Sequence, residues 1–171
     1  LPDKDVKNLF LSGDGNYIII TACESNTLSQ TSYSVWVYDV HSQNSYNTEL
    51  IYDYSSTETE NSFQLQLIPG ESASVFSIYD GRHTIDIYDC QKKSLLSSIP
   101  VTWDNEHYIR FRFFNQDQLL ITADPDRISL YECNSGTQIC SVSPDILVGN
   151  ALQFPYINIS ASADSNYFSV Q

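Results

Sequence analysis

The chain has few basic residues, no methionine and no long apolar run. Its 171 residues include 8 Lys plus Arg against 21 Asp plus Glu, which gives a formal net charge of −13. Such a chain is not expected to bind nucleic acid or an anionic membrane surface, because both need clustered Lys and Arg. No apolar run approaches the roughly 18 residues that span a bilayer. Because the chain starts at Leu1 and has no Met, we expect a segment of a longer chain or a processed one.

Catalytic and metal-binding motifs are also missing. The sequence has no G-x-S-x-G nucleophile elbow, no H-E-x-x-H zinc motif and no phosphate-binding P-loop. His83 and His107 have carboxylates nearby, which would suit a metal or an acid–base role, but we expect exposed turn histidines. Residues 124–126 are read as a polar turn and not as a calcium loop, since further ligands are missing. We therefore predict no enzyme activity, no cofactor and no metal.

The four cysteines, at positions 23, 90, 133 and 140, match no C-x-x-C spacing. If the turn 134–137 closes a hairpin with Cys133 opposite Gln138, Cys140 lies opposite Tyr131. The two cysteines are then diagonal neighbours roughly 7–8 Å apart, which is longer than a good disulfide allows. We expect free, buried thiols and hence an intracellular location, cytoplasmic or nuclear.

Strand patterns dominate the sequence. Alternation with a period of two is clear in Phe63–Leu67 and Ile109–Phe113. A five-residue pattern, aliphatic, any residue, aliphatic, Tyr, acid, occurs three times, and its tyrosines are Tyr38, Tyr88 and Tyr131. An apolar segment, a polar turn and a second apolar segment precede each copy. A period of about 40–50 residues with four short strands is typical of a propeller blade.

These repeats resemble the WD-repeat β-propeller family. Tyr stands where the family usually has Trp, and the turn 134–137 resembles the family's Gly-containing turn, although no Gly-His dipeptide occurs. The resemblance implies an all-β fold, a β-propeller segment of about three and a half four-stranded blades over residues 1–171. The expected blades span about 6–54, 61–102 and 107–142, with an incomplete blade at 151–171.

The same resemblance implies a non-enzymatic scaffold for protein–protein interactions within a larger complex. Propellers close with about four to eight blades, so we expect the remaining blades to come from the same chain or another chain. The alternative is an enzymatic or ligand-binding propeller, lactonase-like or quinone-dependent, with a site at the channel mouth. A β-sandwich adhesion module is disfavoured, because sandwiches lack a repeated four-strand unit.

Two basic residues are candidates for a site in the central channel. Arg110 and Arg112 alternate with Phe111 on a strand that we expect to be the innermost of its blade. Two like charges on one face of a central strand need acidic partners or an anion. We expect them to pair with carboxylates or carbonyls of a neighbouring blade, and a channel anion site is the alternative.

An acidic rim is the main candidate for partner binding. In a propeller, the loops between second and third strands and between blades emerge on one rim, which here would carry a net charge of −7 against −2 on the other. Two polar segments, 24–31 and 55–60, are expected to be long loops on this rim. We predict that the rim binds a basic segment of a partner protein, against the alternative of a face that only aids solubility. The candidate residues are Glu24, Glu58, Glu60, Asp80, Asp104, Glu106, Asp124 and Asp126.

Overall fold

The structure is a computed structural model, and its regular elements are all β-strands among the residues it describes. These are residues 4–27, 30–42, 48–57, 65–81, 83–101, 109–124, 127–143, 159–162 and 167–170. In this part of the chain there is no helix long and apolar enough to cross a membrane.

The strands form three four-stranded sheets and one two-stranded sheet, which we call blades 1 to 4. Every sheet is an antiparallel meander in which chain order equals spatial order. Blade 1 contains β1 (Asp5–Leu11), β2 (Tyr17–Thr27), β3 (Gln30–Asp39) and β4 (Thr48–Thr57). Blade 2 contains β5 (Gln66–Pro69), β6 (Val75–Tyr79), β7 (Thr84–Asp89) and β8 (Ser94–Pro100). Blade 3 contains β9 (Arg110–Phe114), β10 (Leu119–Ala123), β11 (Ile128–Glu132) and β12 (Gln138–Val142), and blade 4 contains β13 (Ile159–Ala161) and β14 (Phe168–Val170).

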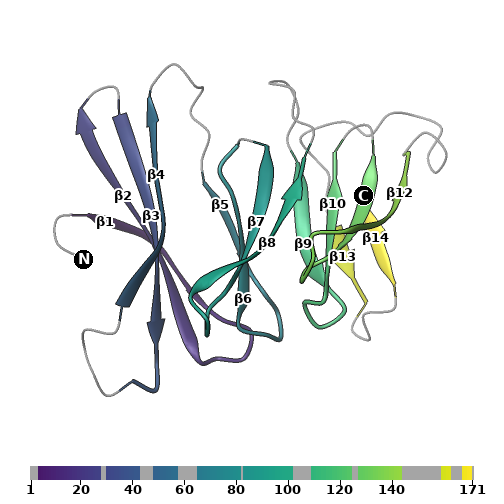
Figure 1. Cartoon of the computed structure of the whole chain (residues 1–171), viewed down its shortest axis with the longest axis horizontal. Helices are drawn as coiled ribbons and strands as arrows, with labels where there is room; N and C mark the ends of the chain where they lie inside the picture. Colours follow the sequence, from purple (N-terminus) through teal and green to yellow (C-terminus); the bar gives the residue numbers. More distant parts are fainter. Residues whose placement is uncertain are drawn as a thin grey trace.

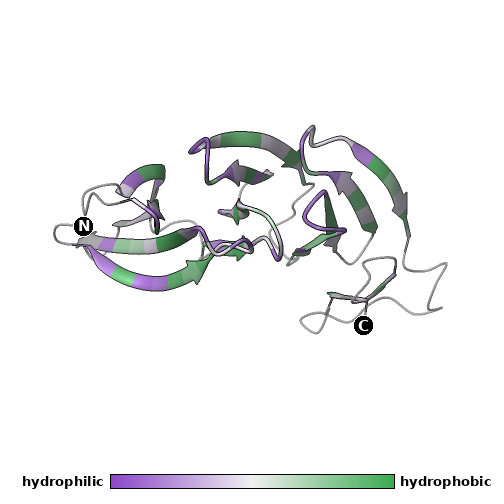
Figure 2. Ribbon diagram, turned by 90° about the horizontal axis from the view of Figure 1, so that it is seen from below, coloured by the Kyte–Doolittle hydropathy of each residue, from purple (hydrophilic) through white to green (hydrophobic). Residues whose placement is uncertain are grey.

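The blades stand side by side along a curved path (Figures 1 and 2). Apolar clusters fill the space between consecutive blades. Because both faces of blades 2 and 3 are covered, their second strands are buried on both sides, from Phe76 to Tyr79 in β6 and from Leu120 to Ala123 in β10. The all-β propeller segment of about three and a half blades that the sequence predicts is confirmed.

The repeated Tyr-acid pattern lies on the third strand of each blade. In blade 2, Ile85 and Ile87 face blade 3, whereas Tyr88 faces blade 1. In blade 3, Tyr131 likewise packs in the cluster shared with blade 2. The pattern is therefore a two-sided packing unit, in which the aliphatic residues cover the next blade and the tyrosine covers the preceding one.

Two local predictions are wrong. Residues 24–31 are expected to be a long loop, but β2 continues to Thr27 and β3 starts at Gln30. Residues 55–60 are expected to be a second long loop, but β4 runs to Thr57, and residues 58–60 lie outside the described residues. The reason is that Ser and Thr side chains allow the ladder to continue, since β-branched Thr suits an extended strand.

The predicted pairing around Cys140 is wrong by one residue. A bulge between Leu130 and Tyr131 shifts the register, so Tyr131 pairs with Gln138 and Leu130 with Cys140. Cys140 is also exposed and not buried as expected, because it lies on the outer strand β12, all of whose side chains are exposed. All four cysteines are free, and the other three are buried.

Candidate functional site

In blades 1 to 3, the second and fourth strands end at the same end of the sheets, which we call the upper rim (top of Figure 1). The second strands β2, β6 and β10 all run toward this rim. Glu24 lies near the end of β2, Asp80 directly follows β6, and Asp124 directly follows β10. All three side chains are partly exposed. The other candidate rim residues lie outside the described residues, and they are Glu58, Glu60, Asp104, Glu106 and Asp126.

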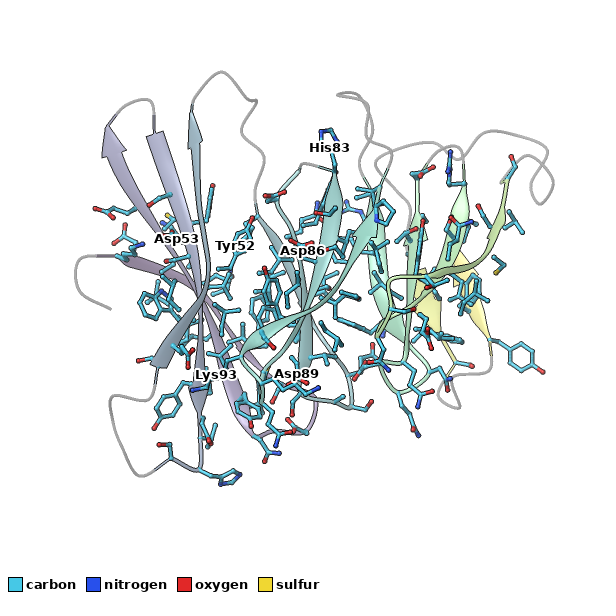
Figure 3. The ribbon with its side chains drawn as sticks, viewed as in Figure 1. Tyr52, Asp53, His83, Asp86, Asp89 and Lys93 are labelled. Atoms are coloured by element: carbon cyan, nitrogen blue, oxygen red, sulfur yellow. The ribbon has the colours of Figure 1, made fainter. Side chains whose placement is uncertain are left out.

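Asp80 connects two blades. The hydroxyl of Tyr52 on β4 donates a hydrogen bond to Asp80 Oδ2 over 2.7 Å, and Figure 3 shows Tyr52 between blades 1 and 2. The ring of Tyr52 also meets that of Tyr88 edge-on, with centroids 6.3 Å apart. Burial, together with the charges of Asp86 and Asp80, raises the pKa of Tyr88 to about 12. Asp80 thus fixes the upper rim where blades 1 and 2 meet.

Asp124 organises its own turn. Its carboxylate accepts a hydrogen bond from the backbone N–H of Arg127 over 2.8 Å, and its own N–H donates to the Arg127 carbonyl over 3.0 Å. This arrangement closes the turn between β10 and β11. Asp80 and Asp124 are therefore held in place, while Glu24 projects from the extended hairpin of β2 and β3.

A cavity of about 590 Å³ opens between the first strands of blades 2, 3 and 4. Its wall contains the end of β5 and the following turn, most of β9, and Ile159 of β13. Both candidate arginines, Arg110 and Arg112, line it. Both candidate arginines therefore lie at one hollow between three blades.

The two arginines differ in their partners. Arg112 donates from Nε to Glu71 Oε1 of blade 2 over 2.9 Å and pairs with the same carboxylate through Nη2. Its Nη1 donates to the Ile159 carbonyl of blade 4 over 3.2 Å. Arg112 thus has partners of the two kinds considered in the sequence, a carboxylate and a carbonyl. Arg110 forms no ion pair within the described part of the chain.

The opposite end, which we call the lower rim, holds a set of contacts that the sequence analysis missed. Asp117, in the turn between β9 and β10, is only 6% exposed. Its carboxylate accepts hydrogen bonds from the backbone N–H groups of Glu71, Ser72 and Ala73 at 2.7–2.8 Å and from the Ser72 hydroxyl at 3.0 Å. One carboxylate of blade 3 thereby satisfies three successive amides in the turn of blade 2.

Asp14 holds the same blade 2 turn from the other side. The Ser74 hydroxyl donates to its carboxylate, which also accepts from Ser12 Oγ over 2.6 Å and from the Asn16 side chain over 2.7 Å. Burial opposes ionisation of Asp14, but these hydrogen bonds outweigh it and lower its pKa to about 2. The signal in the sequence is an acid in the first turn of each repeat, at Asp14, Glu71 and Asp117.

The histidines are not grouped with other metal ligands in the part of the chain that can be placed. His83 is exposed at the upper end of β7 (Figure 3), and His41 Nε2 lies 3.0 Å from Asn16 Oδ1. His107 lies outside the described residues. Across the described ranges, no three His, Cys, Asp or Glu residues are close enough to hold a metal ion.

Comparisons with known proteins show the fold and leave the family open. No protein-family model matches the chain, and no curated protein matches it significantly. Among solved structures, it is similar to Sqt1 of Saccharomyces cerevisiae, with a TM-score of 0.55 and 14% identity over 91% of this chain and 40% of Sqt1. Hsv2 of Kluyveromyces marxianus matches with a TM-score of 0.42 and 16% identity over 82% of this chain and 40% of Hsv2.

Sqt1 and Hsv2 are WD40 β-propeller proteins. At 14% identity, the likeness to Sqt1 concerns the arrangement of the strands. This chain spans about 40% of the length of either neighbour. The likeness to Sqt1 therefore shows a β-propeller fold, of which this chain matches a part.

Proposed function

We propose that this chain is a non-enzymatic scaffold whose acidic upper rim binds a basic segment of a partner protein within a larger complex. The observation that carries the proposal is the common direction of β2, β6 and β10, which supports a shared location for Glu24, Asp80 and Asp124. The compartment that suits such a partner and the free thiols is the cytoplasm or the nucleus.

The charge of the chain supports a basic partner over an acidic or neutral one. A net charge of −13 creates a field that attracts cationic segments and repels nucleic acid. Because the Debye length is about 8 Å at physiological salt, only charges gathered on the contacting surface contribute much. Binding through the upper rim should therefore weaken steeply as salt rises.

Charge reversal tests the rim. The variant Glu24→Lys, Glu58→Lys is compared with Glu49→Lys, Glu132→Lys, which has the same number of charge reversals at exposed residues toward the lower rim. The probe is an octalysine peptide, measured by calorimetry at low and physiological salt. We expect the upper-rim variant to lose at least about tenfold in affinity and the control variant less than about threefold. Equal losses in both variants would reject the rim and leave only a general charge effect.

The cavity supports a second candidate, a site for a small anion. Arg110 lines the hollow, whereas the charge of Arg112 is already matched by Glu71. A thermal-shift series with inorganic phosphate and citrate tests this reading in the wild type and in Arg110→Gln. A stabilisation that saturates in the wild type and disappears in Arg110→Gln supports it. The same shift in both proteins rejects it.

A further inference from the structure

Every four-stranded sheet of this fold ends in two edge strands, each of which pairs with a described strand on one side only. The sheets of blades 1 to 3 therefore have six edge strands, which are β1, β4, β5, β8, β9 and β12. The outward N–H and C=O groups of an edge strand can pair with another extended chain, and proteins commonly protect their edges with charged side chains or proline. The residues of each edge strand thus indicate which edge is open to a partner.

Five of the six edge strands carry a charged residue or a proline. These protective residues are Asp5 and Lys7 in β1, Glu49 and Asp53 in β4, Pro69 in β5, Pro100 in β8, and Arg110 and Arg112 in β9. The sixth edge strand, β12, reads Gln-Ile-Cys-Ser-Val and contains neither a charge nor a proline. In the three four-stranded sheets, β12 is therefore the edge with no such protection.

The side chains of β12 are exposed along the whole strand. Ile139 is 55% and Val142 43% exposed, and Cys140 is an exposed free thiol. The strand pairs with β11 and lies at the end of the sheet order β12-β11-β10-β9. An uncharged edge strand with exposed apolar side chains has the properties of the surfaces to which extended peptides bind by strand addition.

A bulge can also protect an edge, but here it does not distinguish β12 from the other outer strands. The register between the third and fourth strands shifts once in each of the three blades. The shifts lie between Val35 and Trp36, between Ile87 and Tyr88, and between Leu130 and Tyr131. The bulge is therefore a feature of the repeat. Beyond it, β12 pairs regularly with β11 from Cys140 to Val142.

Charge indicates which kind of extended chain suits this edge. A second copy of the chain would bring another net charge of −13 toward the first, which opposes association. A segment with Lys or Arg beside its apolar residues is attracted by the same field. A local acid has the same effect, since the exposed Glu132 lies beside the start of β12, where its N–H donates to the Thr137 carbonyl over 2.9 Å.

We propose that β12 is the docking edge for an extended segment of a partner protein, in which alternating apolar residues are flanked by Lys or Arg. The segment adds a strand to the outer side of blade 3. The backbone of β12 supplies the hydrogen bonds, the side chains of Ile139 and Val142 supply apolar contacts, and Glu132 attracts a basic flank. The site lies on the outer edge of the sheet and does not depend on the acidic upper rim.

Hydrogen exchange locates the bound segment. The probe is a peptide with two lysines at each end and an alternating Val-Thr-Val-Thr-Val centre, added to the protein at its natural length. We expect the outward-facing amides of residues 138–142 to exchange at least about tenfold more slowly at saturating probe, because they become hydrogen-bonded. Octalysine should change their exchange by less than about twofold. Unchanged exchange with the alternating probe would overturn the proposal, and so would protection that rises with protein concentration in its absence, since a second copy would then occupy the edge.

Backbone methylation of the probe tests strand pairing directly. In an added strand, alternate N–H groups face β12 and the others point away from it. Two probes are compared, each methylated on one of the two alternate sets of backbone nitrogens. Calorimetry should show one methylated probe within about threefold of the parent affinity and a loss of at least about tenfold for the other, which can no longer donate to β12. Equal affinities of the two methylated probes would mean that strand pairing does not hold the segment.

Substitution of the edge strand provides the matched protein variants. Ile139→Lys introduces the charge that protects other edges, and we expect it to lower the affinity for the alternating probe at least about tenfold. Leu95→Lys is the control, because Leu95 is 50% exposed on the outer strand of blade 2, against 55% for Ile139, and it should cost less than about threefold. Equal losses would reject β12 as the site. The upper-rim variant Glu24→Lys, Glu58→Lys should keep the affinity for this probe within about threefold, so failure of the upper rim and failure of this edge are distinguishable.

Discussion

Oδ2 of Asp117 in blade 3 lies 2.7 Å from the backbone nitrogen of Ser72 in blade 2 and 3.0 Å from its hydroxyl. The same oxygen accepts the N–H of Ala73, and Oδ1 accepts that of Glu71. A carboxylate that accepts hydrogen bonds from three successive amides fixes the angle between two blades, because each hydrogen bond constrains a different direction. Asp117 also follows Asn115 and Gln116 in a run of three residues with φ between 51° and 63°. That left-handed backbone is costly for residues with side chains, and the hydrogen bonds of Asp117 offset the cost.

Asp117→Ala should lower the free energy of unfolding by at least about 3 kcal/mol, because it leaves several amides without an acceptor at the blade junction. Urea denaturation followed by circular dichroism measures the loss. The matched control is Glu132→Ala, an exposed acid at the same rim, which should change stability by less than about 0.5 kcal/mol. If the two variants are equally stable, Asp117 does not hold the blades together.

Gly13→Ala should destabilise the junction of blades 1 and 2. A Cβ added at Gly13 would overlap the backbone of Glu71 and Ser72, which cannot rotate away. Gly15→Ala is the control, since its position is open. Its φ of 75° still strains a side chain by about 1 kcal/mol. Thermal unfolding should show a clearly larger loss for Gly13→Ala than for Gly15→Ala. The reverse order would mean that the blade turns are farther apart than described.

Asp14 should make stability depend on pH in the acidic range. Its pKa lies at about 2 in the folded chain against an ordinary value of 3.8. The folded state therefore favours the charged carboxylate, so the stabilisation is complete above about pH 4 and disappears as the pH falls toward 2. Melting temperatures from pH 5 to pH 2 should fall more steeply for the wild type than for Asp14→Asn. Ser74→Ala, which removes one donor to Asp14, should give part of the same flattening. A constant difference between wild type and Asp14→Asn at every pH would contradict this account.

The cysteines should differ sharply in reactivity. Burial, with a contribution from Asp14, raises the pKa of Cys90 to about 12, and burial with the nearby Asp117 does the same for Cys133. A thiol that is buried and protonated is a poor nucleophile. We therefore expect a maleimide or disulfide reagent at pH 8 to label only the exposed Cys140 in the native chain and all four cysteines in denaturant. Cys140→Ser should abolish the fast reaction. Fast labelling of a second thiol would show that a blade junction opens.

The blades could be predicted from the sequence, because their signals are local. Period-two alternation identified β9, and the spacing of Tyr38, Tyr88 and Tyr131 identified the repeat. Each tyrosine lies on a strand that pairs with the strands next to it in the chain. A short sequence pattern was therefore sufficient to locate each blade.

The lower-rim contacts could not be predicted in the same way. Asp117 and Ser72 are 45 residues apart, and they meet only after two complete blades have packed together. The bulge at Leu130 and Tyr131 is likewise a cross-strand property that leaves no composition signal. In the candidate site, the order of the strands was sufficient to predict which acids share the upper rim. The difference between Arg112 and Arg110 could not be predicted, because the partners of Arg112 lie in two other blades.

The turn between β5 and β6 of blade 2 donates hydrogen bonds to both neighbouring blades, to Asp14 of blade 1 and to Asp117 of blade 3. In an array whose units touch only their immediate neighbours, stability is a sum of unit and junction terms. Blade 2, which is hydrogen-bonded at both of its junctions, should then lose its amide protection last during hydrogen exchange. Unfolding should begin in the outer blades and reach blade 2 last. Mechanical pulling on the termini would peel the outer sheets first and meet its highest resistance at the middle one.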